Sequence, residues 1–120
     1  MLSLLNRPTK KQCHDGMALL LIAALLVGGF NAYAATKPKV HIVVIEAMQF
    51  SPKIVEVNSG DTVIWKNKDP FPHTATSDNR SFKSGEIPAN RSWKFVARKK
   101  GNFPYSCALH STMKGTLIVK

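Results

Sequence analysis

The stretch "KIVEVNSGDTVIWKN", residues 53–67, combines two short apolar runs with a polar turn between them. Residues 53–57 and 62–67 are rich in valine and isoleucine, and large apolar side chains recur at every second position, which is typical of strands that bury one face. The turn "NSGD" at 58–61 predicts a hairpin in which Gly60 takes a positive φ. The centre of the chain is therefore expected to be β-structure.

Similar runs continue on both sides of this stretch, and no helical period of 3.6 persists after residue 35. Residues 78–91 are polar, contain glycine and proline, and predict a loop. The further strands are expected at 40–50, 73–77, 92–97, 103–107 and 115–120. About seven short strands separated by turns predict an all-β protein, a compact β-sandwich.

The first 34 residues differ from the rest of the chain. Basic residues precede the uncharged run "ALLLIAALLVGGF" at 18–30, and Ala32 and Ala34 then form a small-x-small pattern. A basic stretch, an apolar core and such a site predict a secretory signal peptide over 1–34, cleaved before the domain at 35–120. A retained membrane anchor is the alternative, although 13 apolar residues are short for a span of about 20. We therefore expect export to the periplasm without stable membrane insertion.

The charge of the mature segment limits the classes of partner. It holds 14 Lys and Arg against 6 Asp and Glu, a formal charge of +8, and "RKK" at 98–100 is its only basic run. Scattered lysines on alternate strand positions mostly form a solvated surface. Nucleic acid is not expected as a partner of an exported protein, which leaves acidic proteins or an anionic membrane surface.

Near the end of the chain, "SCALHSTMKG" at 106–115 gathers three chemically distinct side chains: Cys107, His110 and Met113. Cys13 leaves with the signal peptide, so Cys107 is the only cysteine of the mature segment and cannot form an internal disulfide. An unpaired thiol in an oxidising compartment needs a reason, and metal ligation is one. The alternative is a chance grouping of a buried cysteine, a surface histidine and a core methionine.

A fourth metal ligand is expected upstream. His73 follows the strand-breaking "DPFP" at 69–72 and lies at a loop edge, whereas His41 lies within a predicted strand and is expected to be an ordinary surface imidazole. One thiolate, two imidazoles and a thioether suit copper in both oxidation states. Structural zinc normally takes four strong ligands, which this set does not offer.

On these four residues and the sequence around them, the chain resembles the cupredoxins, which are blue-copper proteins. Among them it resembles the group of plastocyanin, amicyanin and pseudoazurin. The matching pieces are "MQFSPKIVEVNSGDTVIWKN", "PH" at 72–73, the spaced Gly-x-Phe-x-Tyr-x-Cys ending at Cys107, and "CALHSTMKG". The gap of two residues between His110 and Met113 is similar to that of amicyanin. The resemblance implies a Greek-key sandwich and assigns one copper ion to four ligands: His73, Cys107, His110 and Met113.

One position departs from the pattern of the family, in which an Asn often follows the first histidine ligand. This chain has Thr74 there. Its hydroxyl is expected to supply part of the tie between the two ligand loops, and its backbone N–H to reach the Cys107 sulfur. The ligand set is unaffected, but the hydrogen bonding of the sulfur is expected to influence the reduction potential.

The function that this resemblance implies is a one-electron carrier, expected in the periplasm as a monomer, that exchanges electrons with redox proteins through the exposed edge of His110. The charge of +8 predicts that these partners are acidic at the docking surface. Apolar neighbours are expected to form a docking patch around that edge: Phe71, Pro72, Ala108 and Leu109. It is not expected to be an enzyme, because a copper enzyme would need a second site with more histidines. The alternative function is copper handling, in which the protein sequesters or delivers the metal. A metal-free sandwich for adhesion is a further hypothesis.

Overall fold

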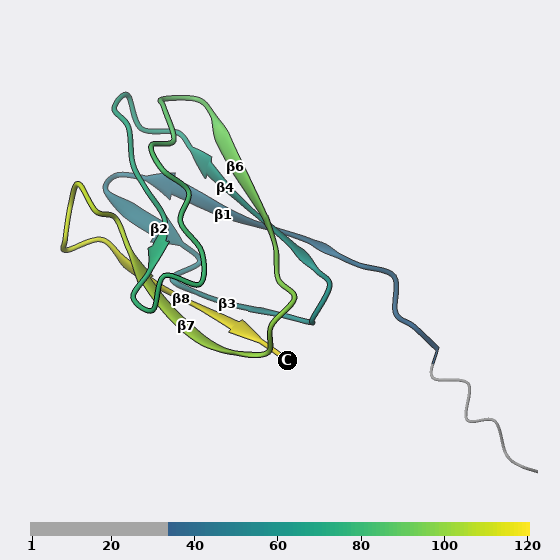
Figure 1. Cartoon of the computed structure of the whole chain (residues 1–120). Coiled ribbons are helices and arrows are strands. Elements are labelled where there is room, and N and C mark those ends of the chain that lie inside the picture. Colours follow the sequence, from purple (N-terminus) through teal and green to yellow (C-terminus); the bar gives the residue numbers. More distant parts are fainter. Residues whose placement is uncertain (1–33) are drawn as a thin grey trace, which may run out of the picture. The chain divides into compact units, whose positions relative to one another are not determined.

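The computed structural model describes residues 34–120, which form a sandwich of two four-stranded sheets (Figure 1). The strands are β1 (Val40–Glu46), β2 (Gln49–Ser51), β3 (Ile54–Val57), β4 (Thr62–Asn67), β5 (Thr76–Ser77), β6 (Ser92–Val96), β7 (Gly101–Ser106) and β8 (Lys114–Val119). The predicted all-β sandwich is confirmed. Among these residues, no helix has the length and apolarity needed to cross a membrane.

The order of strands is β2-β1-β4-β6 in one sheet and β3-β8-β7-β5 in the other. β1 runs parallel to β4, and β3 runs parallel to β8, while the remaining pairs are antiparallel. The chain therefore crosses from one sheet to the other after each of the strands β2, β3, β4, β5 and β6. The loops that follow β4 and β7 reach the same end of the sandwich.

The alternation of apolar residues explains how the two sheets join. Val63 and Trp65 of β4 are fully buried, as their spacing predicts. Leu117 of β8 is fully buried as well, and Val119 is 4% exposed. The Trp65 ring lies at the centre of an aromatic cluster: its centroid is 5.5 Å from that of Tyr105 and 5.3–5.4 Å from those of Trp93 and Phe82. This cluster fixes the distance between the sheets, and hence the positions of the loops at their ends.

Two details of the predicted strands are wrong. Residues 40–50 do not form one strand, because a turn at Ala47 and Met48 folds β2 back on β1. The turn at 58–61 does not close a hairpin, because β3 pairs with β8 and β4 pairs with β1. Gly60 does take the expected positive φ, 98°, but its turn connects the two sheets.

Candidate metal centre

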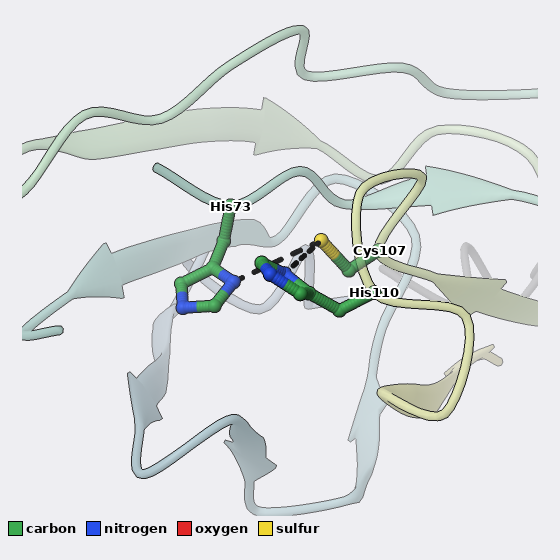
Figure 2. A group of neighbouring side chains, drawn as sticks. All are labelled: His73, Cys107 and His110. Carbon is green, nitrogen blue, oxygen red and sulfur yellow. Dashed lines mark hydrogen bonds between the residues drawn. The ribbon is translucent and has the colours of Figure 1, made fainter. Parts of the chain in front are cut away.

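Three of the four predicted ligands come together at one end of the sandwich. His73 lies between β4 and β5, while Cys107 and His110 lie on the loop from β7 to β8 (Figure 2). The Cys107 Sγ atom is 3.8 Å from His73 Nδ1 and 3.7 Å from His110 Nδ1. The ligand atoms of all three residues lie within 4.8 Å of one another. Pairing of Thr76 with Ser106 in β5 and β7 brings the two loops side by side.

The three side chains differ in their access to solvent. His73 and Cys107 are buried, with exposed fractions of 0% and 1%, whereas His110 is half-buried. Phe71 and Leu109 are exposed to 41% and 48%, and the Phe71 ring centroid is 6.1 Å from that of His110. The imidazole of His110 is therefore the most exposed member of this cluster, and it has apolar neighbours as expected.

The side chain of Asp69 sets the tautomer of His73. Its Oδ2 atom lies 2.8 Å from His73 Nε2, in a buried contact. Burial alone would raise the pKa of Asp69, but three N–H donors outweigh burial and hold the pKa below the usual range. An ionised carboxylate only accepts hydrogen bonds, so His73 Nε2 carries the proton. The Nδ1 lone pair is then directed at the position beside the Cys107 sulfur, as a metal ligand requires.

Asp69 also holds the turn between β1 and β2. Its carboxylate accepts hydrogen bonds from the backbone N–H groups of Ala47 and Met48, at 2.8 and 3.0 Å. Both residues have positive φ, 51° and 62°, a conformation that disfavours residues with a side chain. The carboxylate compensates by pairing both amides. One side chain thus joins the turn to His73, a role that is not expected from the sequence.

Asn67 orders the loop that carries the first ligand. Its Nδ2 donates to the backbone oxygens of Phe71 and Ile87, both at 2.9 Å, and its Oδ1 accepts from the Asp69 N–H. The backbone of His73 exchanges two hydrogen bonds with that of Ile87. The loop is therefore held in place by polar contacts on both sides of Asp69.

Thr74 joins the two ligand loops in the two ways expected. Its backbone N–H lies 3.3 Å from the Cys107 sulfur, and its Oγ1 accepts a hydrogen bond of 2.7 Å from the N–H of Ala108. A threonine therefore provides the connection for which the family often uses asparagine. An N–H directed at the sulfur would donate a hydrogen bond to it when the sulfur is bound to a metal.

Met113 closes the loop of the second and third ligands. It is buried, with 2% of its surface exposed. Its backbone oxygen accepts from Cys107 N at 3.1 Å, and its N–H donates to the His110 oxygen at 3.0 Å. Its position at the base of this tight loop keeps it next to the cluster. Ligation by its thioether stays a prediction.

The donor set fits copper better than zinc. A thiolate with two imidazoles, in a buried site with a methionine beside it, matches the trigonal sites of blue-copper proteins with a weak axial thioether. Among the histidine, cysteine, aspartate and glutamate side chains of the described residues, His73, Cys107 and His110 have ligand atoms close enough to share a metal ion. Cys107 is a free, buried cysteine and is available as a ligand.

The chain belongs to the family described as the cupredoxin-like domain, whose profile matches residues 17–119. Within that family it is similar to amicyanins. Amicyanin-alpha of Methylorubrum extorquens is 28% identical over 108 residues, which cover 82% of this chain and 87% of that protein. Amicyanin of Paracoccus versutus is 24% identical over 123 residues, with coverage of 86% and 93%.

The fold agrees with solved structures of the same group. A mutant of amicyanin with Cu(I) superposes with a TM-score of 0.64 at 22% identity, covering 68% of this chain and 82% of that one. The resemblance to the cupredoxins that the sequence indicates is thereby confirmed, as is the sandwich it implies.

Proposed function

We propose that this chain is a periplasmic type 1 copper protein, which carries one electron at a time between redox proteins and catalyses no reaction of its own. The observation that carries the proposal is the convergence of His73 Nδ1, Cys107 Sγ and His110 Nδ1 within 4.8 Å of one another. Met113, buried beside them, is the proposed fourth ligand. The amicyanins that resemble the chain, one of them solved with Cu(I), support the assignment.

The residues around the cluster suit electron transfer because they hold its donors still. Bound copper would supply the Cu(I) and Cu(II) states between which the electron is stored. Asp69 fixes the His73 ring, and the Thr74 N–H is directed at the Cys107 sulfur. Donors that stay in place when the charge of the metal changes need little reorganisation, and preorganised polar groups lower the barrier of such a step.

Electrons are proposed to enter and leave through the edge of His110, the half-buried member of the cluster. Phe71 and Leu109 offer apolar contact beside it, and transient redox encounters use small contacts of this kind. With 14 basic against 6 acidic residues over 35–120, the partners are proposed to be redox proteins with acidic docking surfaces. The carrier is proposed to be a monomer and not to bind nucleic acid.

The location rests on the sequence. The basic, apolar and small-residue pattern over 1–34 supports export through a cleaved signal peptide, and residues 1–33 lie outside the described part of the chain. A periplasmic location also accounts for a mature segment with a single cysteine, committed to a metal.

The experiment that tests the function compares electron exchange with metal release. A carrier is expected to exchange electrons rapidly between its Cu(I) and Cu(II) forms and to retain copper against a competing chelator. A copper-handling protein would exchange electrons slowly and surrender Cu(I) readily. Self-exchange measured by NMR line broadening, together with chelator competition on the same sample, separates the two. Slow exchange with ready release would overturn the proposed function.

A further inference from the structure

A second surface lies at the end of the sandwich away from the metal cluster. This is the end where β1 and β4 begin and β6 ends (Figure 1). Residues that alternate with the buried ones in these strands lie on the outer side of the sheet, and several of them are apolar. The pairing places Ile42 opposite Ile64, and Val40 and Val96 on either side of Thr62. Val40 and Ile42 are 62% and 55% exposed. We call these four residues the aliphatic face: Val40, Ile42, Ile64 and Val96.

Within this face Val40 and Ile42 are exposed, and Ile64 and Val96 are half-buried. The opposite side of the same strands packs in the core through Val43, Ile45, Val63 and Trp65. Exposed isoleucine and valine on one side of a sheet are ordinary when single, but a contiguous group marks a contact surface. The proposed carrier function, which uses the end with His110, gives this group no role.

Basic residues surround the aliphatic face. Lys94 is opposite Ile64 on β6, Lys37 and Lys39 precede β1, and the run at 98–100 follows β6. Asp61 holds these segments together: its Oδ1 accepts from Lys39 N at 2.8 Å, and its backbone oxygen accepts from Ala97 N at 2.8 Å. The only basic run of the mature segment thus follows β6 at the same end of the sandwich as the exposed Val40 and Ile42.

Acidic groups at this end do not offset the charge. The Asp61 carboxylate is buried and accepts hydrogen bonds from two backbone N–H groups and from His41. Glu56 is paired with Lys120. The other exposed acidic residues of 34–120 are at the far end of β1, after β5 and in the loop before β6: Glu46, Asp78 and Glu86.

We propose that the aliphatic face and its basic surround bind the surface of an anionic lipid bilayer. Basic clusters beside apolar side chains gain affinity from the summed negative charge of the lipids and from shallow apolar burial. A protein partner is less suited, because protein interfaces are depleted in lysine and enriched in aromatic residues at their centres, and the aliphatic face has no aromatic residue. Contact at this end would leave the end with His110 directed away from the bilayer and free to meet redox proteins.

The test uses vesicles of phosphatidylglycerol and phosphatidylcholine in equal parts, with pure phosphatidylcholine vesicles as the neutral comparison. The chain is expected to sediment with the anionic vesicles at low salt, to be released as salt rises, and not to bind the neutral ones. Metal-free and copper-loaded protein should bind alike. A failure of the copper assignment would therefore not affect this result, and the two proposals fail separately.

Matched variants localise the contact. Replacing Arg98, Lys99 and Lys100 by glutamine should lower partitioning more than about tenfold, since each basic residue near the surface contributes about 1 kcal/mol. The control removes the same charge from the metal end, at Lys53, Lys68 and Lys114, and should have a clearly smaller effect. All variants are prepared as the proposed mature segment 35–120, so the apolar run at 18–30 contributes to none of the measurements.

The aliphatic part is tested in the same way. Ile42→Ser should weaken binding several-fold, whereas Ile54→Ser should leave it unchanged, because Ile54 is equally exposed, at 59%, but lies on β3 of the other sheet. Equal losses from both charge triples would show attraction by net charge alone and would overturn the proposal. Absence of binding to anionic vesicles would overturn it as well and would favour an acidic protein as occupant of this face.

Discussion

Replacement of Asp69 by asparagine tests whether this carboxylate positions the first metal ligand. In the folded chain Asp69 accepts from Ala47 N, Met48 N and His73 Nε2, at 2.8–3.0 Å. Asn has the same shape but offers one acceptor oxygen, and its NH₂ group must face a donor. If the amide oxygen takes the place of Oδ2, it keeps the hydrogen bonds from Met48 and His73, and only the Ala47 N–H loses its partner. If the amide oxygen takes the place of Oδ1, the N–H groups of Met48 and His73 both lose their acceptor.

The magnitude follows from these contacts. Hydrogen bonds to charged groups contribute about 1.5–3 kcal/mol, and a buried donor left without a partner costs a similar amount. The free energy of unfolding of the metal-free protein should therefore fall by about 2–4 kcal/mol in Asp69→Asn. Loss of a carboxylate that orients a ligating histidine should also weaken copper binding by about 10–100-fold.

Urea unfolding of the metal-free variant and chelator competition for copper measure the two effects separately. Asp78→Asn is the matched control, because Asp78 is an exposed carboxylate after β5 and such changes usually stay within about 0.5 kcal/mol. If Asp69→Asn kept wild-type stability and copper affinity, Asp69 would not position His73. A loss of stability with unchanged affinity would restrict its role to the turn between β1 and β2.

Three other changes test separate parts of the structure. In Gly115→Ala the added methyl would lie inside van der Waals contact with the buried Tyr105 ring, so thermal or urea unfolding should show a loss of about 1–3 kcal/mol; an unchanged stability would contradict this packing. Met113→Leu should keep copper and raise the reduction potential measured by voltammetry, and Met113→Gln should keep copper and lower it, because an oxygen donor favours Cu(II); unchanged potentials in both would remove the thioether from the site. The pKa of Asp61 is lowered from 3.8 to about 2, first by the hydrogen bond from the Lys39 N–H. The ionised carboxylate therefore stabilises the folded protein above about pH 4, and this stabilisation is lost as the pH falls through about 2. Acid titrations of the free energy of unfolding should show the loss in the wild type and not in Asp61→Asn.

The sequence predicts the strands well where apolar residues alternate on a buried face. Residues 62–67 form β4 as expected, with Val63 and Trp65 inside. The hairpin within 40–50 could not be predicted, because Ala47 and Met48 are not residues that favour positive φ. Their conformation depends on Asp69, which is 21–22 positions away in the chain and comes close only after folding.

In the metal centre, too, local sequence patterns predict the ligands but not the contacts between residues that are distant in the chain. Residue types and their resemblance to the cupredoxins identify His73, Cys107 and His110, which the structure brings together, and the two hydrogen bonds of Thr74 were also expected. Asp69 was considered only as part of a strand-breaking segment. An acidic residue before proline, four positions from a ligating histidine, is the signal that could have identified it. Its second contact, with the β1–β2 turn, is visible only in three dimensions.

The visible spectrum of the copper-loaded protein, compared with that of Cys107→Ser, tests the central claim most directly. A thiolate bound to Cu(II) at this site should give intense visible absorption and a narrow copper hyperfine splitting. Cys107→Ser should lose both while the sandwich remains folded by circular dichroism. A wild-type Cu(II) form without colour, or a serine variant with the same spectrum as the wild type, would contradict the assignment of His73, Cys107 and His110 as a blue-copper site.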